Sequence, residues 1–244
     1  MKSFSLFVTT LLLLNLGVTA QKTIIRNTTI IPTHISQCFE NKDIVIENGT
    51  ILTIRDYLQN DTAAYDQVVD GQGKFVIPGM VDAHAHFPEK DMVETYFLMN
   101  LVNGVTTLRS MRGEEWHLAL DRDGKFTPNL ILSSVPIRRK DSIAVAEVDA
   151  LVKKYKEANV DFIKILSIAS AAHFDALVEA SKKHDIKVAG HCSNPIDYEK
   201  ALTSGVYESI EHLHGHAWLR EFEKMISTLD LGVENNVAIT PTTD

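Results

Sequence analysis

Two histidines in the first half of the chain have the type and spacing that metal chemistry uses. The stretch VIPGMVDAHAHFPEK, residues 76–90, is an apolar run followed by His84 and His86. Alternate side chains of a β-strand project from the same face, so two such imidazoles come within reach of one metal ion. A His-x-His pair alone is a weak indication, because a strand can also carry two imidazoles without a metal.

Three further residues of ligand type occupy comparable positions later in the chain. Lys164 lies in DFIKI, a run otherwise suited to burial, and His191 and His212 end the runs VAGH and SIEH. One histidine at the end of a strand is usually structural, whereas four at equivalent strand ends are hard to obtain by chance. Considered alone, Lys164 could equally extend its amine to solvent or pair with an acid such as Asp161.

The elements that must position these residues alternate between strands and helices after Pro78. Apolar runs separated by helical stretches predict βα units around a parallel sheet. The candidate ligands lie near the carboxyl ends of such strands, where barrels of βα units keep their active sites. The expected strands are 80–87, 105–111, 130–135, 161–167, 187–193, 208–212 and 237–241, and the expected helices 92–102, 142–158, 171–185, 195–204 and 218–229.

This change in the sequence pattern at about Pro78 predicts two domains. Residues 78–244 are predicted to form a TIM-like (β/α) barrel with about seven of eight strands, incomplete at the C-terminus, because a complete barrel takes about 250 residues. Residues 21–77 contain short β-branched runs punctuated by Asn-Gly at 48–49 and Asp-Gly at 70–71. Both dipeptides favour hairpins, so we expect a small N-terminal β-sandwich that includes a hairpin across 68–75.

Taken together, these segments resemble the amidohydrolase superfamily, particularly its prolidase-like and imidazolonepropionase-like metal-dependent hydrolases. The resemblance runs from about Ile44 to the last residue, and the combination is specific although no single motif is. The matching segments are PGMVDAHAH at 78–86, GVTTLR at 104–109, Lys164, Gly190-His191 and SIEH at 209–212.

The resemblance implies a centre with two divalent metal ions, zinc or alternatively manganese, cobalt or iron. His84 and His86 would hold the more buried ion, and His191 and His212 the more exposed one. Lys164 would be carbamylated by carbon dioxide and would bridge the ions, because a carbamate offers two oxygens and a negative charge. A bridging hydroxide would then attack the carbonyl of an amide, a peptide or a cyclic amide.

The family pattern also requires an aspartate at the end of an eighth strand, as a metal ligand and proton shuttle. No catalytic residue of this kind is identified, because Asp244 falls one βα unit too early. The expected activity is hydrolysis of C–N bonds by a dipeptidase or another amidohydrolase. The alternatives are a non-catalytic truncated metal-binding fragment and a deaminase of the same superfamily, although in family terms Lys164 favours amide or ester hydrolysis over deamination. His214 and Tyr96 are the candidates for substrate binding.

The N-terminus and the charge restrict compartment and partners. Residues 1–20 combine a basic start, an apolar run and small residues at 18–20, which predicts a secretory signal peptide and a secreted or periplasmic protein without a membrane segment after cleavage. The net charge of −8, with no basic block, argues against nucleic acid. The expected partner is a small-molecule substrate, and a homo-oligomer stays open.

Residues without a pattern receive simpler predictions. Cys38 and Cys192 lie far apart in the sequence and are expected to be buried thiols. The histidines outside the matched segments are expected to face solvent, and these are His34, His117, His173 and His184.

Overall fold

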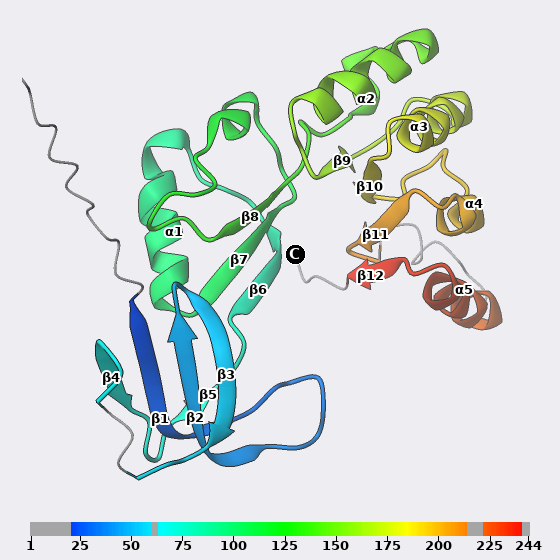
Figure 1. The fold of residues 1–244 in the computed structure, drawn as a ribbon. Coiled ribbons are helices and arrows are strands. Elements are labelled where there is room, and N and C mark those ends of the chain that lie inside the picture. Colours follow the sequence, from blue (N-terminus) through cyan, green and yellow to red (C-terminus); the bar gives the residue numbers. More distant parts are fainter. Residues whose placement is uncertain (1–20, 60–62, 214–221, 241–244) are drawn as a thin grey trace, which may run out of the picture. The chain divides into compact units, whose positions relative to one another are not determined.

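The structure is a computed structural model that describes residues 21–59, 63–213 and 222–240. The chain divides between Pro78 and Gly79 into two compact units (Figure 1). The predicted signal peptide, residues 1–20, and the substrate-binding candidate His214 lie outside the described residues. Each unit is described by itself.

The first unit is a five-stranded sheet in the order β3-β2-β1-β4, with β5 also paired to β1. Strands β1 (Lys22–Ile30), β2 (Phe39–Glu47) and β3 (Thr50–Asp56) are antiparallel neighbours. Asn48 and Gly49 both have positive φ and join β2 to β3, which confirms the first predicted hairpin, because a tight two-residue turn needs this conformation.

The second predicted hairpin, across residues 68–75, is wrong. Strands β4 (Gln67–Asp70) and β5 (Phe75–Val76) both run parallel to β1 and pair with successive parts of it. A side chain at Gly71 would place its Cβ atom 2.6 Å from the Arg26 carbonyl oxygen. Glycine is therefore needed here for a close approach to β1, rather than for a reverse turn.

The second unit contains seven strands that follow one another in chain order (Figure 1). One sheet has the order β6-β7-β8, and the other runs from β9 to β12; all their pairings are parallel. Isolated bridges from Ser133 to Phe162 and from Ile137 to Ile165 join the two sheets. The strands are β6 (Met80–Ala85), β7 (Val105–Ser110), β8 (Asn129–Leu132), β9 (Phe162–Ile165), β10 (Lys187–Gly190), β11 (Tyr207–Glu211) and β12 (Ala238–Thr240).

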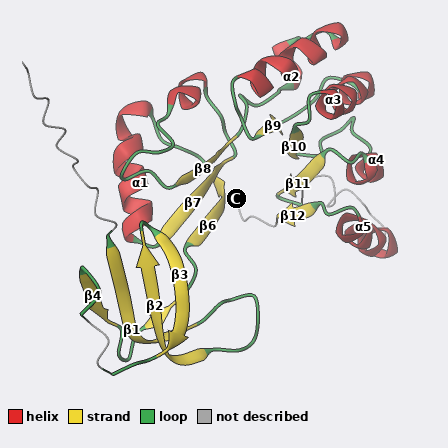
Figure 2. Ribbon diagram, in the orientation of Figure 1, coloured by secondary structure: helices red, strands yellow, loops and turns green. Residues whose placement is uncertain are grey.

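Helices connect most of these strands (Figure 2). The apolar faces of α2, α3 and α4 are buried against β9, β10 and β11, with Val152, Leu177 and Leu202 fully buried in one core cluster. The α-helices are α1 (Val93–Val102), α2 (Val148–Glu157), α3 (Ala171–Lys183), α4 (Tyr198–Thr203) and α5 (Phe222–Glu234), and the 3-10 helices are η1 (Lys90–Met92), η2 (Glu115–Ala119), η3 (Arg139–Asp141) and η4 (Val145–Glu147).

The predicted α/β class and the seven parallel strands are confirmed. Within the described residues β6 and β12 are not paired with each other, so the closed barrel stays a prediction. The N-terminal β-sandwich also stays a prediction, since residues 21–59 and 63–78 form one sheet. In the part of the chain that the structure describes, no helix is long and apolar enough to span a bilayer.

Candidate functional site

The four matched histidines gather at the carboxyl ends of three strands of the second unit. His84 lies in β6 and His86 follows it, while His191 and His212 come directly after β10 and β11. The ring centres of His84 and His86 are 5.4 Å apart, and those of His84 and His212 are 4.6 Å apart. His191 completes the cluster, with its ring centre 5.1 Å from that of His212.

These separations suit imidazoles that share metal ions. Two rings bound to one tetrahedral zinc through nitrogens at about 2.0–2.1 Å have their centres about 5 Å apart. Among the described residues, no group of three His, Cys, Asp or Glu side chains already surrounds a single point as a closed set of ligands. The imidazole donors fit divalent metal by their chemistry and separation, but in the described residues they form a convergent set and not a closed site.

Gly190 sets the position of His191 at the end of β10. Its φ is +129°, and a Cβ atom there would lie 2.1 Å from the Ile165 carbonyl oxygen. His191 in turn donates its backbone N–H to the same carbonyl at 2.9 Å. Only glycine therefore allows β10 to approach β9 closely enough to hold His191 in this place.

We expect Gly190→Ala to lower the free energy of unfolding by about 2–4 kcal/mol, because backbone strain and a steric clash add up. Gly205→Ala is the matched control, since Gly205 also has positive φ but a Cβ atom added there would have nothing within 4 Å. That control should lose about 1 kcal/mol. Urea unfolding compares the two, and equal losses would contradict the role given to Gly190.

Lys164 is fully enclosed in β9, with 2% of its surface exposed. Burial is the main cause that lowers its pKa from 10.5 to about 8, and Arg109 adds to this while Glu211 opposes it. The alternative partner Asp161 is instead paired with Arg122 at 3.0 Å. Lys164 therefore loses its proton and becomes a neutral amine at a lower pH than an exposed lysine does.

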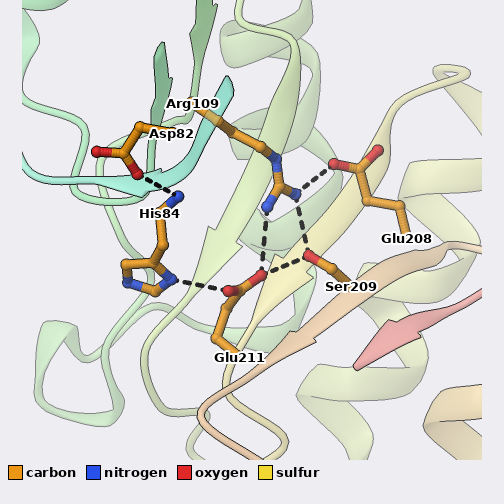
Figure 3. Close-up of polar contacts among 6 residues, drawn as sticks. All are labelled: Asp82, His84, Arg109, Glu208, Ser209 and Glu211. Atoms are coloured by element: carbon orange, nitrogen blue, oxygen red, sulfur yellow. Dashed lines mark hydrogen bonds and ion pairs between the residues drawn. The ribbon is translucent and has the colours of Figure 1, made fainter. Parts of the chain in front are cut away.

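Glu211 is the centre of a polar network that sequence analysis did not identify (Figure 3). Its carboxylate is completely buried and lies 2.7 Å from Nδ1 of His84. The other carboxylate oxygen accepts from Arg109 at 3.2 Å and from the Ser209 hydroxyl at 2.5 Å. Burial by itself raises the pKa of Glu211, but the bonds to His84 and Ser209 and the charge of Arg109 outweigh it and lower the pKa to about 2.

The environment of His86 favours the neutral ring, which metal binding requires. Burial is the largest cause that lowers the pKa of His86, followed by the charges of His84, Lys164, Arg112 and His212. Nδ1 of His191 lies 3.1 Å from the Leu166 carbonyl oxygen. Contacts of this kind fix the tautomer of ligand histidines in metal sites.

Arg109 and Glu211 could have been noticed from their places in the sequence. Each is a charged residue at or near the end of a strand of a parallel sheet, where a lone buried charge is costly. Arg109 donates to Glu208 at 2.6 Å and stacks on the Phe162 ring, with its guanidinium carbon 4.4 Å from the ring centre. Opposite charges on β7 and β11 therefore compensate each other.

The predictions for residues outside the histidine cluster are only partly confirmed. Tyr96 belongs to α1 and packs against Phe87 and Phe97, with ring centres 5.9 and 6.2 Å away, so its described ring contacts are with core residues and not with the histidine cluster. The expectation that His117 faces solvent is wrong, because it is 1% exposed. Cys192 is buried as predicted, whereas Cys38 is exposed, so that prediction is wrong for Cys38.

Comparisons with known proteins agree with the motifs. No family model matches the chain. A dihydroorotase from Thermoanaerobacter sp. (strain X514) is 26% identical over 211 residues, which cover 79% of this chain and 46% of that protein. An adenine deaminase from Clostridium perfringens is 25% identical over 190 residues, which cover 69% of this chain and 33% of that protein.

Solved structures share the fold. A Xaa-Pro dipeptidase with bound methionine in its active site aligns with a TM-score of 0.70 and 22% identity, over 91% of this chain and 66% of that one. Molinate hydrolase aligns with a TM-score of 0.72 and 17% identity, over 90% of this chain and 63% of that one. At these identities the likeness concerns the fold alone.

The sequence relatives and the fold together support a relationship with the amidohydrolase superfamily, as the motifs predicted. The sequence relatives named above are a dihydroorotase and an adenine deaminase, whereas the dipeptidase and molinate hydrolase share the fold. The chain spans about half the length of the dihydroorotase that it matches.

Proposed function

We propose that this chain is part of a metal-dependent hydrolase of C–N bonds that acts on a peptide, an amide or a cyclic amide. One observation carries the proposal: imidazoles from three strand ends gather in the unit that contains the buried Lys164, whose charge acts on the ring of His86. The relationship with the amidohydrolase superfamily supports it. The predicted signal peptide adds the proposal that the enzyme is secreted or periplasmic.

His84, His86, His191 and His212 would hold divalent metal, with zinc preferred and manganese, cobalt or iron as alternatives. Bound metal supplies Lewis acidity and lowers the pKa of water toward neutrality. Lys164 is proposed to carry a carbamate, which forms when the neutral amine adds to the carbon of CO₂ and releases one proton. The lowered pKa of Lys164 supports this, since it raises the neutral fraction of the amine near pH 8.

A group of cations beside the site supports a substrate that carries a carboxylate. Arg138, Arg139 and Lys140 line an open hollow of about 640 Å³ together with Leu166 and Ser167. The Leu166 carbonyl is the group that contacts His191, so the hollow adjoins the histidine cluster. In the described part of the chain these three cations form no ion pair. Dipeptides and N-acyl amino acids have the carboxylate that would complement them.

The proposal is for a protein whose barrel is complete and includes the aspartate at the eighth strand. The reading frame beyond codon 244 provides a direct check. A frame that encodes a further strand ending in aspartate supports the enzyme, and a stop codon at that point favours the non-catalytic metal-binding fragment. A deaminase is the second candidate, favoured by the similarity to an adenine deaminase, and release of ammonia from an aminopurine would identify it.

We expect the protein with a complete barrel, expressed with added zinc and bicarbonate, to contain close to two metal ions per chain. Elemental analysis measures this. It should also hydrolyse an N-acetyl amino acid with a kcat/KM roughly 10- to 100-fold above that for the matched primary amide, because a charge-assisted hydrogen bond contributes about 1.5–3 kcal/mol. A metal-free protein would contradict the site, and equal rates for both substrates would contradict the carboxylate preference.

A further inference from the structure

Glu211 connects two strands that each supply a histidine to the cluster. Its carboxylate contacts the ring of His84 on β6, and the next residue in its own chain is His212. Glu211 is 0% exposed and His84 is 12% exposed at the side chain, so water competes little for this contact. One strand end therefore provides a candidate ligand and also contacts a second one.

The direction of the hydrogen bond between Glu211 and His84 follows from the charges around the carboxylate. An ionised carboxylate can only accept hydrogen bonds. Arg109 and the Ser209 hydroxyl both donate to the other oxygen, which stabilises the ionised form. The Nδ1 atom of His84 must then carry a proton, and in the neutral ring the lone pair is on Nε2.

Arg109 is itself held in place from several sides, so it can keep Glu211 in a fixed orientation. It is 12% exposed at the side chain, stacks on the buried ring of Phe162, and donates to Ser209 at 3.0 Å and to Glu208 at 2.6 Å. A planar guanidinium with several fixed partners loses little further freedom when it binds a carboxylate. The contacts that orient Glu211 thus come from side chains of the chain itself.

We propose that Glu211, held by Arg109 and Ser209, is a positioning residue that fixes His84 with its proton on Nδ1 and leaves Nε2 as the nitrogen that binds metal. This inference rests on the proposed metal site but adds a specific residue and a specific ring nitrogen. A purely structural ion pair between Arg109 and Glu211 would stabilise the unit without controlling the tautomer of His84.

The unmodified chain gives the first test. Labelling of histidine with ¹⁵N and NMR of the metal-free protein at pH 8 should show His84 with a protonated Nδ1 and an unprotonated Nε2, assigned by the loss of its signals in His84→Ala. A wild-type ring with its proton on Nε2 would overturn the proposal, whatever its metal content. This measurement does not depend on any variant of Glu211.

Glu211→Gln and Glu208→Gln form a matched pair for the second test. Both remove a carboxylate that contacts Arg109, but only Glu211 contacts His84. We expect Glu211→Gln to weaken Zn²⁺ binding by roughly 10- to 100-fold in competition with a chromophoric chelator, because a neutral amide can donate as well as accept and no longer fixes the proton of His84 on Nδ1. Glu208→Gln should stay within roughly threefold of wild type, and its His84 signals should be unchanged.

The possible failures can be told apart. Equal Zn²⁺ affinity of the folded Glu211→Gln variant and wild type would overturn the positioning role. If wild type itself binds no Zn²⁺ while the His84 tautomer is as expected, the proposed metal site fails, and the positioning of the ring stands on the NMR result. Thermal unfolding of each variant excludes loss of the fold as the cause of weak binding.

Discussion

Replacement of Lys164 by alanine is expected to reduce kcat/KM of the protein with a complete barrel by at least about 100-fold. The reason is that the proposed carbamate contributes directly to holding the metal, and even outer-shell partners of metal ligands contribute roughly 10- to 100-fold. A short carboxylic acid such as propionate, added to Lys164→Ala, should restore part of the activity by placing a carboxylate in the vacated space. Steady-state kinetics with and without the acid measure both effects.

Lys187→Ala is the control for this experiment. Lys187 is exposed on the neighbouring strand β10 and donates to the Gly205 carbonyl at 2.9 Å. Its loss should leave activity unchanged both with and without the carboxylic acid. Activity of Lys164→Ala equal to that of wild type would remove Lys164 from the proposed site. An inactive Lys164→Ala that gains no activity from the acid would argue against the carbamate while leaving the histidines in place.

The second large effect is on stability. Replacement of Lys164, which should reduce activity, should increase the stability of the fold. Lys164→Met in metal-free, CO₂-free buffer at pH 7 should raise the free energy of unfolding by about 3 kcal/mol, because burial lowers the pKa of Lys164 from 10.5 in the unfolded chain to about 8 in the folded one, and one pKa unit corresponds to 1.36 kcal/mol. The methionine thioether fills a similar volume without a charge. Urea unfolding measures the difference.

The dependence on pH identifies the cause of this gain. Between about pH 8 and 10.5 the unfolded chain binds more protons at Lys164 than the folded chain, so the stability of wild type rises with pH over this range. The advantage of Lys164→Met should therefore be complete below pH 8 and vanish as the pH approaches 10.5. Lys187→Met should show no such trend, and a gain independent of pH would point to packing instead of charge.

Much of the second unit could be predicted because its helices and strands are indicated by the spacing of residues that lie close together in the sequence. The 3.6-residue spacing of Val148 and Val152 gives α2 one buried face, and the apolar run around Ile163 fits a strand covered on both sides. Asn48 and Gly49 are likewise residue types that adopt positive φ readily, so their turn could be predicted from these two residues alone. The Asp70-Gly71 step was misassigned because its role depends on the close approach of β1, which lies far upstream in the sequence.

The polar network around Glu211 could not be predicted in the same way. The partner of Glu211 on β6 is 127 residues away, and its partner on β7 is 102 residues away. The motif around His212 drew attention to the histidine, whereas the charge beside it had no local explanation. His117 illustrates the same point, since its burial depends on Phe87, which packs against it with ring centres 5.1 Å apart.

The division of the second unit into two sheets has a consequence for the order in which the site forms. The β6-β7-β8 sheet supplies His84 and His86, whereas the β9 to β12 sheet supplies His191, His212 and Lys164. Contacts across such long sequence separations form late in folding, because closing a long loop costs chain entropy before the contact is gained. In a nascent chain whose halves have not yet met, each half therefore presents only one pair of these imidazoles, and the full set of candidate ligands comes together only when the two sheets join.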